Sequence, residues 1–159
     1  MIHDARSVAN VMIQKGIDAG EPLTPLQIIK LTYLCQAWML AMYGRPMFRQ
    51  KVQAWQHGPV IPQVYHSVKH HGKNPVRTPI DAKPSIFSRN EKHILDEVYR
   101  VYGDFSGLEL SSLTHVDGSP WHQVTNEYPF RHNHEISHAR MEQYYGDQLA
   151  RYRESNPTG

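Results

Sequence analysis

The stretch that decides the fold is LTPLQIIKLTYLCQAWMLAMYG, which occupies residues 23–44. The Thr-Pro-Leu-Gln at 24–27 supplies an N-cap, a proline for the first helical position and the Gln of a capping box. Beyond this start almost every side chain is apolar, and a helix that is apolar nearly all round is buried among other elements. We therefore predict a central buried helix over about 25–43, ended by Gly44 as its C-terminal cap.

Similar start signals predict further helices around the central one. Ser88 and Ser106 are each followed three residues later by a Glu, which is the pattern of a capping box. Pro62 suits a first helical position, and Ser137 stands directly before the last amphipathic stretch. These signals therefore predict a mainly α-helical, compact bundle built around the central helix.

A small β element is the most that the rest of the pattern allows. The run Lys-Val-Gln-Ala-Trp at 51–55 alternates like a short strand, and a second strand is expected near 76–80. Residues 127–135 are expected to be irregular. We expect one helical domain over residues 1–153, followed by a frayed tail at 154–159.

Length, charge and cysteine content restrict the class of protein. The chain has 159 residues, enough for one domain with a real core, and 17 Lys and Arg against 15 Asp and Glu leave a net charge of +2. Such a balance does not favour nucleic-acid binding. The lone Cys35 fits a reducing compartment, and the N-terminus lacks the order of a signal peptide. We expect a cytoplasmic protein without a membrane span.

The second informative stretch is AWQHGPVIPQVY, residues 54–65. Its Gly-Pro dipeptide is a turn signal, so the block joins the strand before it to the helix after it. Tryptophan and tyrosine at such edges serve both cores and interfaces, so the block is either a corner that fixes the fold or a surface prepared for a partner. We assign a structural role to Gly58, Pro59, Val60, Pro62 and Pro120.

The chain has eleven histidines, so metal binding and catalysis are both considered as functions. His66 and His70 are spaced to share one helix face, and three more histidines lie within 132–138. Neither group has the Cys pair or the His-Glu-x-x-His spacing of a zinc site. His115 follows Ser and Thr residues, but adjacency in sequence is not a catalytic triad. We expect no catalytic residue, no metal site and no cofactor.

Three blocks in a fixed order carry a resemblance to a known family. The first block comprises LTPL at 23–26, IKLTY at 29–33, AW at 37–38 and GRPMF at 44–48. The second is AWxxGPVxPxVY at 54–65, and the third is LTH at 113–115 followed by PW at 120–121. With these blocks the chain resembles the Panacea antitoxin domain, also called the SocA-like or phage-associated GepA-like family, over about residues 5–150.

The resemblance implies an antitoxin of a bacterial or prophage toxin–antitoxin module, which neutralises a cognate toxin by direct protein contact. It implies no catalytic residue and no cofactor, and it implies that the toxin is encoded by an adjacent gene. One departure is Gln27, which stands where the family usually has a basic residue, although Lys30 is retained. We expect the partner to contact Lys30, Trp55, Gln56, His57, Tyr65, His115 and Trp121.

Two alternatives stay open beside this interpretation. The first is a small hydrolase or metal-dependent enzyme that uses His57, His115 and the histidines of 132–138, which predicts that these side chains converge. The second is an adaptor that delivers a partner protein to a protease.

Overall fold

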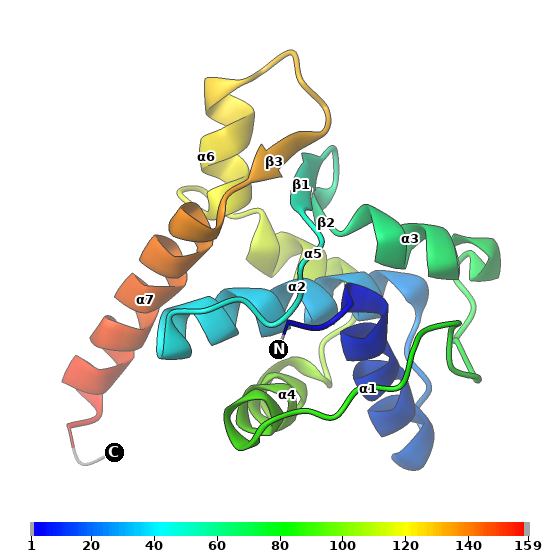
Figure 1. Ribbon diagram of the computed structural model, residues 1–159. Helices are drawn as coiled ribbons and strands as arrows, with labels where there is room; N and C mark the ends of the chain where they lie inside the picture. The colour runs from blue at the N-terminus through cyan, green and yellow to red at the C-terminus, as the bar shows by residue number, and fades with distance from the viewer. Residues whose placement is uncertain (1, 158–159) are drawn as a thin grey trace.

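The computed structural model describes residues 2–157, in which one long helix is surrounded by shorter helices and a small sheet (Figure 1). The helices are α1 (Ala5–Asp18), α2 (Pro25–Tyr43), α3 (Pro62–Val68), the 3-10 helix η1 (Lys69–His71), α4 (Arg89–Tyr102), α5 (Gly107–Thr114), α6 (Pro120–Glu127) and α7 (His138–Ser155). The strands are β1 (Val52–Trp55), β2 (Gly58–Val60) and β3 (His134–Ile136). The predicted fold class, mainly α-helical with a small β element, is confirmed.

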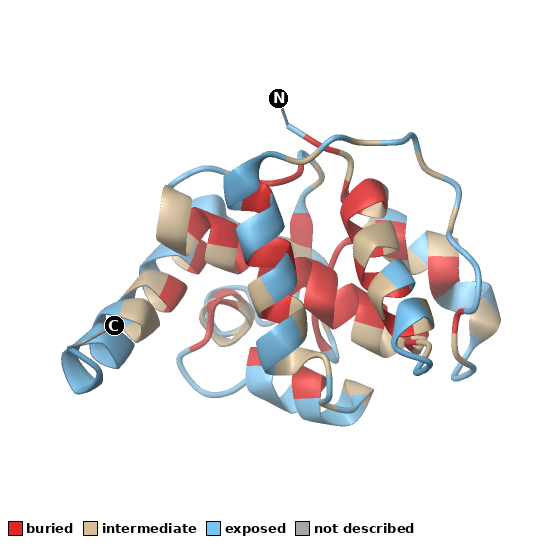
Figure 2. Ribbon diagram, turned by 90° about the horizontal axis from the view of Figure 1, so that it is seen from below, coloured by how far each residue is buried: buried red, intermediate tan, exposed pale blue. Residues whose placement is uncertain are grey.

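Helix α2 forms the centre of the fold, as its sequence predicts. The Thr24 hydroxyl accepts a hydrogen bond from the Gln27 N–H, and the Thr24 N–H donates to Gln27 Oε1 over 2.8 Å. At the other end Gly44 has a φ of 69°, in the left-handed region that favours glycine. Helices α1, α4, α5 and α7 all pack against α2, and Figure 2 shows buried residues gathered on the inner sides of the helices.

The other predicted helix starts are also observed. The hydroxyls of Ser88 and Ser106 accept hydrogen bonds from the backbone N–H three residues on, and the Glu at that position closes each capping box. Ser137 caps α7, and Pro62 occupies the first turn of α3. Each of these signals involves residues within one helical turn, so it can be read without knowledge of the tertiary structure.

The sheet contains three antiparallel strands in the order β2–β1–β3. The strand predicted at 51–55 is confirmed as β1, but the second strand predicted near 76–80 is wrong, because no residue of that segment pairs in a ladder. The Val76 N–H instead donates to the Leu23 carbonyl over 2.7 Å, and the Val76 side chain is buried in the core. Prolines on both sides of Val76 remove backbone donors that a strand would need.

Strand β3 corrects a second expectation. Residues 127–135 were expected to be irregular, yet β3 pairs with β1 so that Ala54 lies opposite His134 and Val52 opposite Ile136. The pairing joins segments about eighty residues apart in the chain, and a three-residue strand has too little pattern to be recognised by alternation.

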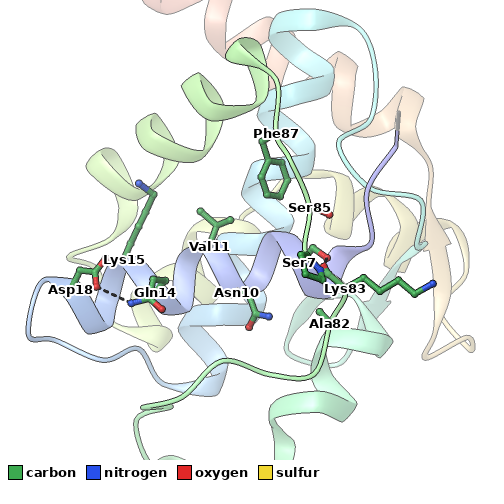
Figure 3. A pocket seen from close by; sticks show the side chains of 11 residues that line it. Ser7, Asn10, Val11, Gln14, Lys15, Asp18, Ala82, Lys83, Ser85 and Phe87 are labelled. Carbon is green, nitrogen blue, oxygen red and sulfur yellow. Dashed lines mark hydrogen bonds between the residues drawn. The ribbon is translucent and has the colours of Figure 1, made fainter.

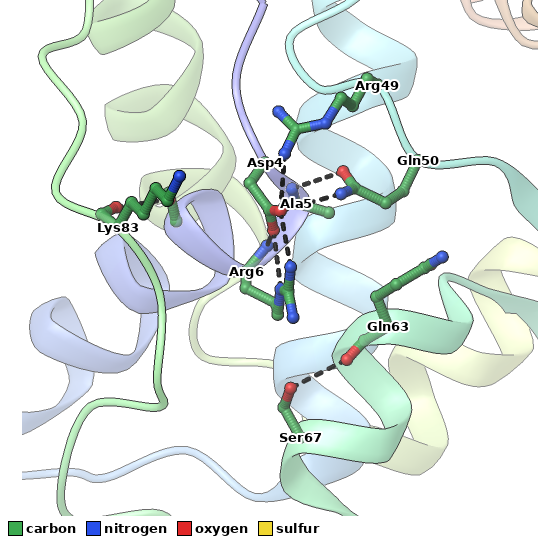
Figure 4. Close-up of polar contacts among 9 residues, drawn as sticks. Asp4, Ala5, Arg6, Arg49, Gln50, Gln63, Ser67 and Lys83 are labelled. Carbon is green, nitrogen blue, oxygen red and sulfur yellow. Dashed lines mark hydrogen bonds and ion pairs between the residues drawn. The ribbon is translucent and has the colours of Figure 1, made fainter.

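Asp4 fastens the start of α1 to the segment that follows α2 (Figure 4). Its carboxylate accepts hydrogen bonds from Arg6 Nε at 2.9 Å, Arg49 Nη2 at 3.0 Å and Gln50 Nε2 at 3.0 Å. The hydrogen bonds from Arg6 hold the pKa of Asp4 well below its usual range. The charged carboxylate therefore stabilises the folded N-terminal segment.

Two further predictions concern membrane spans and the C-terminal end of the domain. None of the helices within residues 2–157 combines the length and hydropathy that a membrane span requires. Helix α7 continues to Ser155, beyond the predicted domain end at residue 153. Part of the predicted frayed tail, residues 158–159, lies outside the described residues, and the assignment of a single domain stays a prediction.

Candidate partner-binding face

The block at 54–65 forms a tight β-hairpin that leads directly into α3. Strands β1 and β2 pair Trp55 with Gly58, so that Gln56 and His57 form an exposed tip. Gly58 has a φ of 119°, where a residue with a side chain is strained. The glycine is therefore required by the backbone path of the hairpin.

Lys30 of α2 lies underneath this hairpin. Its side chain is only 1% exposed, and its Nζ donates a hydrogen bond to the Pro59 carbonyl over 2.7 Å. A Cβ atom on Gly58 would lie 2.9 Å from the same Nζ, so the glycine is also required for space. Burial lowers the pKa of Lys30 to about 7. Lys30 thus supports the hairpin from inside and does not lie on the surface that the tip forms.

Helices α5 and α6 hold the hairpin from a second side. Ser111 Oγ donates a hydrogen bond to the His57 carbonyl over 2.8 Å, and Trp121 Nε1 donates to the Trp55 carbonyl over 2.6 Å. Pro120 is buried in the first turn of α6, which places the Trp121 indole against the hairpin. Backbone carbonyls on both sides of the exposed tip are therefore fixed by side chains of other elements.

Two pairs of aromatic rings lie at this part of the molecule. The rings of Trp55 and Tyr65 meet edge to face with centroids 4.9 Å apart, and the rings of His115 and Trp121 have centroids 5.3 Å apart. All four side chains are half-buried. His115 Nδ1 is buried and has no hydrogen-bond partner within the described residues. Half-buried Trp and Tyr supply both core packing and exposed apolar area, so the block serves as a corner and also presents a surface.

The structure thus brings most of the sequence-predicted contact residues together. We call the surface formed by Trp55, Gln56, His57, Tyr65 and Trp121 the hairpin face. His115 borders it through its contact with Trp121, whereas Lys30 lies beneath it.

The predicted structural residues support this face from the core. Val60 is 7% exposed and Val64 is fully buried, so the hairpin and α3 are anchored in the core that α2 organises. Pro59 and Pro120 are buried as well, and Pro62 starts α3.

Sequence reasoning missed Phe130, which is 93% exposed. It lies in the segment between α6 and β3, and the pairing of Ala54 with His134 brings that segment beside the hairpin (Figure 1). The Tyr128 ring stacks on the His134 ring at a centroid distance of 3.8 Å, which shapes the base of the same segment. No local signal identifies Phe130, because the position of its segment depends on the unpredicted strand β3.

Gln27, which stands where the resembled family usually has a basic residue, makes two structural contacts. Gln27 Nε2 donates a hydrogen bond to the Phe105 carbonyl over 2.9 Å, while its Oε1 completes the capping box of α2. A neutral amide can make both contacts at once, because it carries a donor and an acceptor. The residue therefore joins the start of α2 to the turn before α5.

Two hollows lie away from the hairpin face. One has a volume of about 470 Å³ and lies between α1 and residues 82–87 (Figure 3). On its wall Asn10 exchanges two hydrogen bonds with the Ile80 backbone, which holds the extended segment against α1. The other is a groove of about 830 Å³ between α4 and α7, which includes Trp38 and Tyr152 in its lining.

The described residues give little support to the hypotheses of a hydrolase or a metal-dependent enzyme. Among residues 2–157 no group of three or more His, Cys, Asp or Glu side chains is arranged to hold a metal ion. His115 packs on Trp121 and His134 on Tyr128, so these histidines are engaged with different aromatic partners. Cys35 is buried, and burial raises the pKa of its thiol well above the usual range, which disfavours the reactive thiolate.

Comparison with known proteins supports the family resemblance that the three sequence blocks carry. A family model described as the antitoxin SocA-like Panacea domain matches residues 28–122. The chain belongs to this family of antitoxin-like domains. The matched range contains all but the first turn of α2, together with the hairpin, α3, α4 and α5, and it reaches Trp121, so it includes the whole hairpin face.

One curated relative has the same description. The protein named antitoxin SocA, from Caulobacter vibrioides (strain NA1000 / CB15N), is 28% identical to this chain over 133 residues, covering 77% of this chain and 71% of the relative. No solved structure matches the chain at a significant level.

Proposed function

We propose that this protein is an antitoxin that neutralises a cognate toxin by direct contact through the hairpin face. The observation that carries the proposal is the position of the exposed tip, Gln56 and His57, within the range that matches the SocA-like Panacea domain. The tip is held by Lys30, Ser111 and Trp121.

The support beneath the tip favours recognition. Binding costs less when the contact surface is already ordered, because fewer side chains and backbone torsions have to be fixed on association. The Trp55 and Tyr65 rings add apolar area of the kind that supplies most of the energy in protein interfaces. The hairpin face therefore combines a pre-ordered backbone with aromatic anchors and an exposed polar tip.

The proposal treats the chain as a binding protein rather than an enzyme, acting in the cytoplasm. Ser111 and Thr114 each donate their hydroxyl hydrogen to a backbone carbonyl, at 2.8 Å in both cases, so neither is paired with a base that would activate it. Cys35 is buried on α2. These contacts support a structural use of the hydroxyl groups.

The test is co-expression of this protein with the product of the adjacent gene in a bacterial host. The adjacent gene alone is expected to stop growth, and the wild-type antitoxin is expected to restore it. A Gln56→Ser/His57→Ser variant is expected to fold normally and to lose rescue, because both side chains are exposed and make no described side-chain hydrogen bond. An Arg151→Ser/Glu154→Ser variant on the outer face of α7 serves as the matched control and should rescue fully.

Two outcomes would contradict the proposal. A harmless adjacent gene, or full rescue by the Gln56→Ser/His57→Ser variant, is incompatible with neutralisation through the hairpin face. Toxin protein levels measured in the same cells, with and without the host proteases, separate occlusion of the toxin from its delivery to a protease. Stable toxin levels during rescue indicate occlusion.

A further inference from the structure

Acidic and basic residues are distributed unevenly along this chain, and the small net charge does not reveal this. Residues 22–80 contain seven Lys or Arg residues and no Asp or Glu, although the whole chain has 15 acidic residues. This segment contains α2, the hairpin, α3 and η1, and therefore most of the hairpin face. All carboxylate side chains of the protein lie outside it.

Four of the seven basic side chains have a partner within the protein. Lys30 is buried beneath the hairpin, Arg45 lies 3.5 Å from Glu91, and Arg49 lies 3.0 Å from Asp4. Lys51 lies 4.0 Å from Glu135 on the neighbouring strand. These four charges are compensated or withdrawn from the surface, so they do not supply a free cationic group.

The remaining three are Lys69, Lys73 and Arg77, which are exposed on η1 and the segment after it. Within residues 2–157 no carboxylate lies within 4.0 Å of any of them. The Val76 N–H bond to Leu23 fixes this segment against the core, so the Arg77 side chain starts from an anchored backbone.

These three charges continue the hairpin face at one side. Lys69 Nζ lies 5.9 Å from the centroid of the Tyr65 ring, and the Tyr65 ring contacts Trp55. Side-chain contacts therefore run from Lys69 through Tyr65 to Trp55 and connect the free cations to the hairpin. Figure 1 shows α3 extending from the hairpin toward η1 on one side of the molecule.

We propose that Lys69, Lys73 and Arg77 form a cationic edge of the hairpin face that binds an acidic patch on the partner protein. This inference rests on the proposed function and adds the chemistry of the partner. Unpaired cations next to an aromatic interface raise the association rate with an acidic partner and select against basic ones. A protein is favoured over a nucleic acid because Trp55 and Tyr65 are half-buried and pack edge to face on each other, unlike the open aromatic platforms on which bases stack.

The test measures binding of the purified adjacent-gene protein to the full chain by surface plasmon resonance. The charge-reversal variant is Lys69→Glu/Lys73→Glu/Arg77→Glu. The matched control reverses three exposed charges elsewhere, Arg89→Glu/Lys92→Glu/Arg151→Glu. A third variant, in which Lys69, Lys73 and Arg77 are all replaced by Gln, removes the charges without adding new repulsion, and thermal melts check that each variant is folded.

The expected result is a loss of affinity of about 30-fold or more for the reversal variant, with a smaller loss for the Gln variant and none for the control. Most of the loss should lie in the association rate. Raising the salt from about 50 to about 300 mM should weaken wild-type binding, leave the Gln variant nearly unchanged and partly restore binding of the reversal variant, because salt screens both attraction and repulsion. The same measurement is made with a single-stranded DNA of about 20 nucleotides.

Failure of this inference and failure of the proposed function give different outcomes. Tight, salt-independent binding that the reversal variant retains overturns the cationic edge and leaves the antitoxin proposal standing. Absence of binding by the wild-type chain overturns both. Tighter binding of the DNA than of the adjacent-gene protein, lost in the reversal variant, assigns the edge to nucleic acid and overturns the protein partner.

Discussion

The indole Nε1 of Trp121 donates a hydrogen bond to the backbone carbonyl of Trp55 across 2.6 Å. The two residues are 66 positions apart in the chain, and they belong to the second and third of the sequence blocks that define the family. The bond explains why both blocks are needed together. The third block carries the side chain that holds the hairpin of the second block in place.

Replacement Trp121→Phe tests this relationship. Phenylalanine keeps most of the ring but lacks the donor, so the Trp55 carbonyl loses its side-chain partner. We expect a loss of about 1–2 kcal/mol in the free energy of unfolding, measured by urea denaturation. Amide exchange should accelerate at residues 54–58 and stay unchanged in α4. An unchanged exchange rate at the hairpin would show that the bond does not hold it.

Replacement Gly58→Ala combines two costs. The φ of 119° is unfavourable for alanine, and the new Cβ would lie 2.9 Å from Lys30 Nζ. We expect destabilisation of about 2–4 kcal/mol. The matched control is Gly118→Ala, where φ is 85° and no atom lies within 4 Å of the added Cβ. The control combines a positive φ with open space around the added Cβ, so equal losses at both sites would contradict the contact with Lys30.

Replacement Lys30→Met tests the buried amine through the pH dependence of stability. Burial lowers the folded-state pKa of Lys30 from 10.5 to about 7. Between these values the unfolded chain binds more protons than the folded chain, so wild-type stability rises with pH there. From pH 7 to pH 9 we expect the wild type to gain about 2 kcal/mol relative to Lys30→Met in chemical denaturation.

A control lysine sharpens that measurement. Lys92→Met removes an exposed lysine of α4 and should follow the wild-type pH dependence. A Lys30→Met variant whose stability changes with pH in parallel with the wild type would mean that Lys30 has an ordinary pKa and is hydrated.

Replacement Asp4→Asn tests the network that fastens α1. Asparagine is also a good N-cap, so the change removes the charge and keeps the helix start. The pKa of Asp4 lies below its usual value of 3.8, so its contribution is complete above that pH and is lost as the pH falls toward the folded-state pKa. We expect Asp4→Asn to cost about 1–2 kcal/mol at pH 7. The difference from wild type should shrink steadily below pH 3.8, and a constant difference would contradict the account.

The correct sequence predictions are those that depend on local chemistry. The capping boxes at Thr24, Ser88 and Ser106 involve residues within one turn, and all three form. The apolar run of α2 gives its burial for the same reason, because a helix without a polar face has to be covered on all sides. The turn signal of the Gly-Pro dipeptide was placed two residues too late, because Gly58 and Pro59 belong to strand β2 and the turn is formed by Gln56 and His57.

Most of the failures concern contacts between distant segments, but two are local: prolines flank Val76 where a strand was predicted, and strand β2, which pairs with β1 across a two-residue turn, was not predicted. Strand β3 cannot be recognised from three residues, and its pairing with Val52 and Ala54 depends on the path of the intervening chain. Lys30 was expected to contact the partner, yet its side chain is buried and its Nζ donates a hydrogen bond to the Pro59 carbonyl beneath the hairpin. The exposed Phe130, in the segment that leads into β3, was also missed.

The most direct test of the central claim is hydrogen–deuterium exchange of this protein with and without the purified adjacent-gene product. The account predicts slower exchange on binding in residues 54–66 and 119–123, with a weaker effect at 69–77. Unchanged exchange in those segments, with protection confined to the groove between α4 and α7, would contradict recognition through the hairpin face.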